Sequence, residues 1–277
     1  MSLKSDFMGE KSQIILQQVK EGEVSAYRAG DLVLTVSDED AARVQQISHV
    51  SADVVEQLPF TEEIGEPSLV PFKDRTGVVF VGSGHNGNVE VVDSLIKDIM
   101  PLLCARIPNV TLHLVGSPKW IKMAQGKPCV HGTGEVDSVL PFLQTSRVFL
   151  NPMVNMGSGI STKSFLALAH GLPIVTTKHG LRGLCYKKRT CPGVSVGNDA
   201  TTFAAEVEKL YTSEEIWQRA SGDARKFAQE NISVESVAKK ESRLKGMLRS
   251  LGMAGCAKAN SDGPSWLSRP NNWVGRL

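Results

Sequence analysis

The sequence lacks the features that mark several large classes of protein. No apolar run among its 277 residues approaches the ~18 residues of a transmembrane helix, and Met1–Asp6 shows no signal-peptide core. Lysine and arginine number 31 against 29 acidic residues, and a net charge of +2 does not predict nucleic acid or a membrane surface as a partner. Hydrophobic residues make up 41% of the chain, which predicts a globular protein rather than a disordered or collagen-like one.

Cysteine is scarce and scattered. The five cysteines form no CxxC pair, and an odd, dispersed set predicts reduced thiols in a reducing compartment, hence a cytoplasmic protein. Cys185 and Cys191 lie close together in a basic loop, where an ordinary pair of thiols is the favoured interpretation and a redox-active pair is the alternative. The histidines show no metal spacing with the cysteines, so neither a metal nor a cofactor is predicted.

Short β-branched runs alternate with longer helical patterns along most of the chain. Strands are predicted at 31–36, 54–60, 77–81, 110–115, 129–132, 148–150, 173–177 and 194–196. Helices are predicted at 88–106, 135–144, 160–170 and 201–251. Strands that alternate with helices pair in parallel through right-handed crossovers. The sequence therefore predicts an α/β protein with a doubly wound, parallel, Rossmann-like sheet.

Composition divides the chain into three predicted regions. Residues 1–70 form a short first region, which runs into an acidic, proline-containing linker. Residues 71–251 form the Rossmann-like domain, and residues 252–277 form an irregular tail. Within the first region, Ser37 precedes three acidic residues and is predicted to cap a helix, because its hydroxyl can accept a backbone N–H while the acids oppose the positive helix end.

Glycine-rich loops follow three of the predicted strands, at 82–88, 151–161 and 177–183. Ligands of a doubly wound sheet bind beyond the carboxyl ends of its strands, so all three loops are candidates. Residues 82–87 read G-x-G-x-x-G, as in dinucleotide-binding folds. That interpretation also needs an acidic residue after the second strand, where this chain has Gly116-Ser117-Pro118. A dinucleotide is therefore not favoured, and a tight turn without ligand contact stays open as an alternative.

The loop at 151–161 carries a stronger signal. Gly157 and Gly159 alternate with hydroxyl residues just before a predicted helix, and Lys163 lies in the first turn of that helix. Backbone N–H groups and one ammonium can neutralise much of a pyrophosphate without a metal ion. The sequence predicts a ligand role for Lys163, with an ordinary solvated lysine as the alternative.

Taken in order, these segments resemble the C-terminal half of a retaining GT-B glycosyltransferase of the group 1, or family 4, type. The resemblance covers about residues 24–237, and its most specific block is residues 157–183. The other segments that carry it are Leu34–Asp40, Val79–Ser83 followed by Asn88, Leu112–Gly116, Gly134–Val136 and Asn151–Pro152.

The resemblance implies two Rossmann-like domains that face each other across a cleft. This chain would supply the domain that binds the donor, with residues 1–70 as a remnant of the acceptor-side domain. The implied activity is transfer of a hexosyl group from a nucleotide-diphosphate sugar to an unidentified acceptor, with retention and without a metal. The residues implied to bind the donor are Gly82, Ser83, Gly157, Ser158, Gly159, Ile160, Lys163 and Leu166. No catalytic residue is identified.

Two departures from the family pattern matter. The family commonly has glutamates where this chain has Ser158 and Leu166. A leucine cannot accept hydrogen bonds from ribose hydroxyls, so donor affinity or donor choice must differ. In addition, only about 70 residues precede the Rossmann-like domain, as expected of a fragment or of a protein that has lost its acceptor domain. The alternative function is a degenerate, non-catalytic domain that binds a nucleotide or a protein, and Leu166 either lines the donor pocket or belongs to the core.

Overall fold

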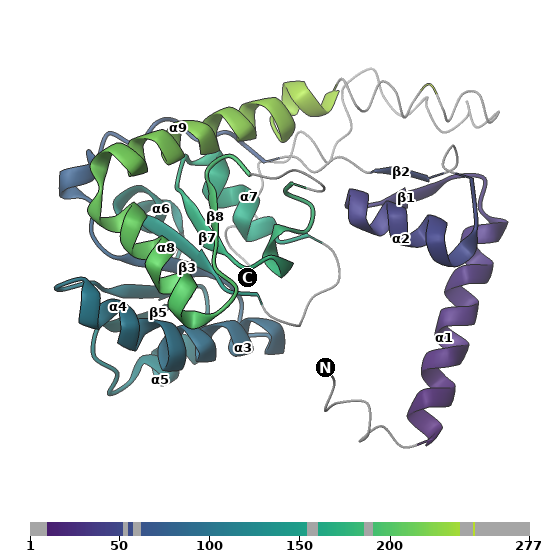
Figure 1. The fold of residues 1–277 in the computed structure, drawn as a ribbon, viewed down its shortest axis with the longest axis horizontal. Helices are drawn as coiled ribbons and strands as arrows, with labels where there is room; N and C mark the ends of the chain where they lie inside the picture. Colours follow the sequence, from purple (N-terminus) through teal and green to yellow (C-terminus); the bar gives the residue numbers. More distant parts are fainter. Residues whose placement is uncertain are drawn as a thin grey trace. The chain divides into compact units, whose positions relative to one another are not determined.

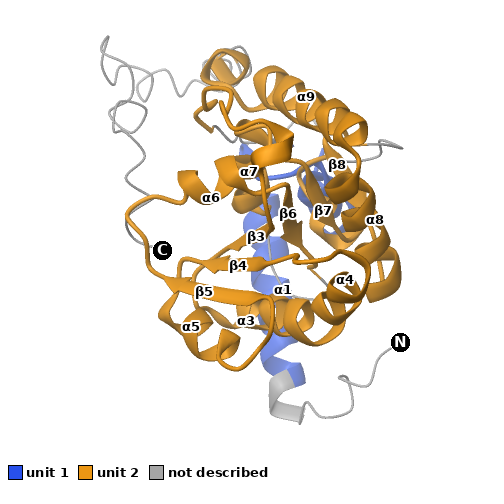
Figure 2. Cartoon of the chain, turned by 90° about the vertical axis from the view of Figure 1, so that its left-hand side faces the viewer, with its two compact units in different colours: residues 1–58 blue, residues 59–277 orange. Residues whose placement is uncertain are grey.

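The computed structural model describes residues 10–51, 55–57, 62–153, 160–185, 191–238 and 246. The chain divides into two compact units, residues 1–58 and 59–277, coloured blue and orange in Figure 2. The region boundaries at residues 70 and 251 stay predictions, and the tail at 252–277 lies outside the described residues. Among the described residues, no helix is long and apolar enough to cross a membrane.

The first unit contains one β–α–β element preceded by a helix. Its elements are α1 (Glu10–Ala29), β1 (Val33–Thr35), α2 (Asp38–Ser48) and β2 (Val55–Gln57). The two strands pair in parallel. Ser37 caps α2 as predicted, because its Oγ accepts the backbone N–H of Asp40 at 3.1 Å.

The second unit is built on a six-stranded parallel sheet. Its strands are β3 (Val78–Val81), β4 (Leu112–Val115), β5 (Val130–Gly134), β6 (Val148–Asn151), β7 (Ile174–Thr176) and β8 (Val194–Val196). They lie in the order β5-β4-β3-β6-β7-β8, so the order of the strands along the chain reverses between β3 and β6. This is the doubly wound Rossmann order. The predicted fold class is confirmed.

Helices cover both faces of this sheet (Figure 1). One face packs against α3 (Asn86–Ser94), α4 (Met100–Arg106), α5 (Pro118–Ala124) and α8 (Ala200–Thr212), and this apolar layer is called the first core. The other packs against α6 (Leu140–Thr145), α7 (Thr162–Ala169) and α9 (Glu214–Asn231), and is called the second core. Along β3, Phe80 enters the first core and Val79 the second. Burial on both faces explains why this strand reads as a continuous apolar run.

The helix predicted at 88–106 is continuous from Asn86 to Arg106 but is not regular throughout. A π-helical turn, η3 (Leu95–Ile99), joins α3 to α4 just before Pro101. Proline has no N–H to donate, and its ring crowds the preceding turn, which accounts for the wider turn at this point.

Two other helices differ from their predicted bounds. The helix predicted at 135–144 begins only at Leu140. The helical region predicted from residue 201 is interrupted at Ser213, which ends α8 and caps α9 by accepting the N–H of Ile216 at 3.3 Å. Serine at this position favours a cap over a helix interior because its hydroxyl competes for backbone N–H groups.

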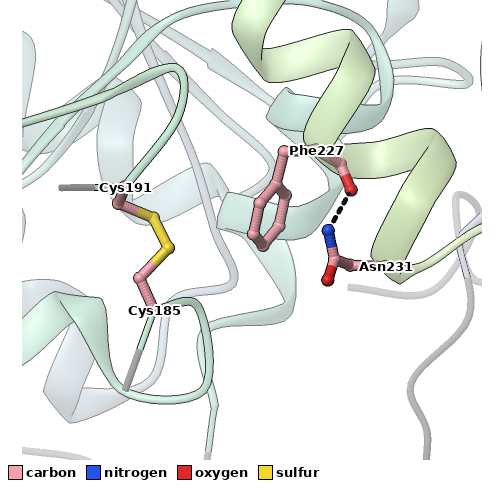
Figure 3. The surroundings of a disulfide bond; sticks show 4 residues. All are labelled: Cys185, Cys191, Phe227 and Asn231. Carbon is pink, nitrogen blue, oxygen red and sulfur yellow. Dashed lines mark hydrogen bonds between the residues drawn. A yellow bond between two sulfur atoms is a disulfide. The ribbon is translucent and has the colours of Figure 1, made fainter. Parts of the chain in front are cut away.

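Cys185 and Cys191 form a disulfide (Figure 3). Both side chains are buried in the second core, which also contains Phe227 of α9. The prediction of ordinary thiols for this pair is wrong, since the loop brings the two Cα atoms to 5.5 Å, a separation that suits a disulfide. Cys104 and Cys129 are free. The cysteines therefore no longer argue for a reducing compartment, and the cytoplasmic location stays a prediction without that argument.

Candidate functional site

Two of the segments predicted to bind a ligand, the loop after β3 and the start of α7, lie at the same edge of the sheet. In a doubly wound sheet, the ligand site lies at the carboxyl ends of the strands, where their order reverses. In this chain that point lies between β3 and β6. The loop that begins at Gly82 follows β3, and the first turn of α7, with Lys163, comes after β6.

Five of the eight predicted site residues lie in the described part of the chain. These are Gly82, Ser83, Ile160, Lys163 and Leu166. Gly157, Ser158 and Gly159 lie outside the described residues, and their roles stay predictions.

The first two carbonyl groups of the loop after β3 are held by side chains. The Gly82 carbonyl accepts the indole N–H of Trp120 at 2.8 Å, and the Ser83 carbonyl accepts the Asn88 amide at 2.9 Å. A Cβ at position 82 would lie 2.9 Å from the Asn88 amide nitrogen, which is closer than van der Waals contact allows. A side chain at position 82 would displace the Asn88 amide, whereas glycine lets the amide lie against the loop.

The backbone N–H groups of the same loop differ in whether they are paired, and the Gly82 N–H donates to the Val115 carbonyl at 2.9 Å. Lys119 donates to the Gly84 carbonyl, and His85 caps α3 by accepting the N–H of Gly87 at 3.2 Å. The N–H groups of Ser83, Gly84 and His85 have no hydrogen-bond partner within the part of the chain that the structure describes. Unpaired N–H groups at a strand-to-helix turn attract anions.

Lys163 supplies a partly buried positive charge beside this loop. Its ammonium donates to Asn88 Oδ1 and lies 4.9 Å from the centroid of the Phe80 ring. Across the described residues, no carboxylate forms an ion pair with it. Burial lowers the pKa of the Lys163 ammonium from 10.5 to about 8. A buried cation without a counter-ion is stabilised by any anion that binds next to it.

Asn151, the last residue of β6, fixes the start of α7. Its Nδ2 donates to the hydroxyl oxygens of Ser161 and Ser164, both at 3.0 Å. The Thr176 hydroxyl donates to the Asn151 carbonyl at 2.7 Å and so ties β7 to the same point. These bonds hold the first turn of α7, and with it Lys163, against the carboxyl end of the sheet.

The side chains of Ile160 and Leu166 lie in a different environment from the Lys163 ammonium. Both side chains are half-buried and pack against the second core. The Lys163 ammonium instead lies against Phe80, which belongs to the first core on the opposite face of the sheet. The sequence left open whether Leu166 lines the donor pocket or belongs to the core, and its packing against the second core agrees with the second alternative.

Three neighbours of the site were not assigned a role from the sequence, namely Asn88, Lys119 and Trp120. The sequence does contain a pattern that could have identified Lys119. Ser117 followed by Pro118 is typical of a helix start, and Ser117 indeed caps α5. That start places Lys119 in the first turn of a helix after β4, the strand next to β3.

The comparison with protein families gives one match. The model of the group 1 glycosyl transferases matches residues 75–213, which is half of the chain and includes both the loop after β3 and Lys163. No curated protein matches the chain.

Solved structures share the fold at low sequence identity. Sucrose-phosphate synthase from Thermosynechococcus elongatus aligns with a TM-score of 0.67 at 15% identity, over 91% of this chain and 65% of that one. TarM, known from S. aureus, aligns with a TM-score of 0.67 at 15% identity, over 82% of this chain and 46% of that one. HepE from Anabaena aligns with a TM-score of 0.63 at 13% identity, over 82% and 66%.

The chain spans between 46% and 66% of the length of these three proteins. At 13–15% sequence identity, these similarities show that the fold is shared and nothing more. The family match covers the strands and loops that form the candidate site. On that match, this chain belongs to the group 1 glycosyl transferases.

Proposed function

We propose that this site binds the diphosphate of a nucleotide sugar and that the chain takes part in transfer of the sugar. Lys163 carries the proposal, because its partly buried ammonium has no carboxylate partner among the described residues. Asn88 accepts a hydrogen bond from Lys163 and donates one to the Ser83 carbonyl. The backbone N–H of Ser83 is one of the three N–H groups of the loop that have no partner among the described residues. A cation and several N–H groups at one point suit a diphosphate.

The same groups suit the chemistry of glycosyl transfer. When the bond between sugar and diphosphate breaks, negative charge grows on the leaving diphosphate. Donors that are already in place stabilise this charge without reorganising, and they do so without a metal ion. We extend the proposal to a hexosyl group, to retention at its anomeric carbon, and to Gly157, Ser158, Gly159 and Ile160 as the residues that frame the sugar.

Two solved structures indicate which nucleotide to test first. The Anabaena HepE structure contains UDP and glucose, and the pneumococcal GtfA structure contains UDP and GlcNAc. We therefore take UDP as the primary probe for this chain, and GDP and ADP as its competitors.

Calorimetric titration with UDP, GDP and ADP, each with and without EDTA, tests the proposal. We expect one nucleotide to bind equally well in both conditions. Lys163→Ala should weaken binding by about tenfold or more, since a charged hydrogen bond is lost. Lys122→Ala removes an exposed lysine of α5 and serves as the matched control. Binding that disappears with EDTA contradicts the metal-free site, and equal binding by Lys163→Ala contradicts its location.

One observation favours a second function, a nucleotide-binding module that transfers no sugar. Leu166 stands where the resemblance calls for a ribose-binding glutamate, and it packs against the second core. Mass spectrometry of UDP-hexose incubated with the chain and a panel of sugar acceptors separates the two functions. Glycosylated product supports the transferase, whereas tight UDP binding without product or released sugar supports the module.

A further inference from the structure

Asn88 joins the two halves of the candidate site. The residue lies in the first turn of α3 and is 9% exposed. Its Nδ2 donates to the Ser83 carbonyl at 2.9 Å, and its Oδ1 accepts the Lys163 ammonium. A carbonyl oxygen only accepts and an ammonium only donates, so these two partners fix which way the amide points.

The amide provides a hydrogen bond but no compensating charge. A carboxylate at the same position would form an ion pair with Lys163 and cancel its charge locally. Among the described residues, the titratable side chains that form a hydrogen bond with the backbone of this loop are His85 and Lys119, and neither is acidic. Burial lowers the pKa of Lys163 to about 8, as expected of a buried ammonium with no opposite charge beside it.

We propose that Asn88 is a positioning residue for the donor diphosphate: it holds the Lys163 ammonium beside the loop and leaves the charge of that ammonium uncompensated. The inference rests on the proposed function of the site. It goes further by assigning the anion preference to a residue that is itself neutral. A bound anion then provides the negative charge that no described residue supplies to Lys163.

The surroundings of Asn88 support this role. A Cβ at position 82 would meet the Asn88 amide at 2.9 Å and the Phe80 ring at 3.0 Å. The missing side chain of Gly82 therefore leaves room both for the amide and for the ring on which Lys163 lies. The backbone N–H of Asn88 donates to the His85 carbonyl at 2.9 Å, which fixes the residue at the helix start.

Two substitutions at one position separate charge from structure. Asn88→Asp keeps the shape of the side chain and adds a carboxylate, but it loses the Nδ2 group that donates to the Ser83 carbonyl. Asn88→Ala loses this donor and also the Oδ1 that accepts from Lys163, so the two variants share the loss of the donor and differ in the negative charge. Asn109→Asp makes the same chemical change at an exposed position before β4 and is the matched control. Each variant is titrated with UDP and with inorganic pyrophosphate, and the pKa of Lys163 is followed by NMR of lysine labelled with carbon-13.

We expect Asn88→Asp to weaken UDP and pyrophosphate binding by about tenfold or more and to weaken it further than Asn88→Ala does. We also expect it to raise the pKa of Lys163, while Asn109→Asp changes neither quantity. Wild-type binding by Asn88→Asp, stronger loss in Asn88→Ala than in Asn88→Asp, or an unchanged pKa of Lys163 would overturn the proposal. A side chain at position 88 that did not contact Lys163 would leave this pKa unchanged.

The outcome also distinguishes this inference from the proposed function. If the wild-type protein binds neither UDP nor pyrophosphate, the proposed function fails, and the Lys163 titration alone decides the role of Asn88. If Asn88→Asp does not fold, Asn88→Ala decides it, since loss of the accepting oxygen should lower the pKa of Lys163 below its wild-type value. An unchanged pKa in that variant overturns the inference.

Discussion

The Lys163 ammonium lies 4.9 Å from the centroid of the Phe80 ring, which is itself fully buried. The face of an aromatic ring attracts a cation, but it replaces only part of the hydration that the cation loses on burial. Burial lowers the pKa of Lys163 to about 8 for this reason. Lys163 therefore opposes folding of the unliganded protein while it prepares the site for an anion.

Replacing this charge should stabilise the unliganded protein and weaken its anion binding. Lys163→Met keeps an apolar chain over the Phe80 ring and removes the buried ammonium. Because the pKa falls from 10.5 to about 8 on folding, the cost of burial is complete below pH 8 and disappears as pH rises through 10.5. Urea unfolding at pH 7 and pH 10.5 checks this: the stability gain of Lys163→Met should be large at the lower pH and small at the higher. A variant less stable than wild type at pH 7 contradicts it.

Binding of UDP should be linked to proton uptake. A diphosphate next to Lys163 raises the pKa of the ammonium above its unliganded value of about 8, so the complex holds a proton that part of the free protein lacks. Affinity should therefore fall as pH rises above 8. Calorimetry in buffers of different ionisation enthalpy measures the protons taken up at pH 8.5. The uptake should disappear in any Lys163 variant that retains weak binding, and equal uptake in such a variant would assign it to another group.

Glu62, which is not part of the candidate site, should make the stability of the protein depend on pH. Its backbone N–H donates to the Ile232 carbonyl at 3.0 Å, and burial raises the pKa of its carboxyl from 4.5 to about 7. The folded state thus holds a proton that the unfolded state has lost, and stability falls as pH rises from 4.5 through 7. Glu62→Gln should raise the melting temperature at pH 8 and leave it unchanged near pH 4. Glu230→Gln, at an exposed position of α9, is the control and should show no such difference.

Leu166→Glu distinguishes the core and pocket alternatives for that residue. Its packing against the second core leads us to expect destabilisation by about 1–3 kcal/mol, because a carboxylate would replace an apolar contact. Melting curves and UDP titrations are measured on the same preparation. A melting temperature close to wild type, together with a larger gain in affinity for UDP than for pyrophosphate, would instead place Leu166 in the donor pocket.

The sheet could be predicted from the sequence because its strands carry their own signal. The apolar run at Val78–Val81 and its position between glycine and helix predicted a strand covered on both faces. Parallel pairing also predicted that the loops after the strands share one edge. The contact of Asn88 with Lys163 could not be predicted, since 75 residues separate them and the contact depends on β3 lying next to β6.

The disulfide was missed for a related physical reason. Whether Cys185 and Cys191 approach each other depends on how their loop folds onto the second core, and the spacing of cysteines alone does not determine that. The helix predicted at 135–144 begins only at Leu140, and the position of Pro141 accounts for this start. Pro141 follows at the second position, where the helix tolerates proline because the first N–H groups have no acceptor within it.

A crystal structure of this chain with UDP tests the central claim most directly. We expect a diphosphate oxygen within hydrogen-bond distance of Lys163 Nζ, about 2.7–3.2 Å, and a second oxygen at the same distance from the N–H of Ser83 or Gly84. The uracil and ribose should lie beyond the carboxyl ends of the strands. UDP bound elsewhere on the chain, with Lys163 still in contact only with Asn88 and Phe80, would contradict the account.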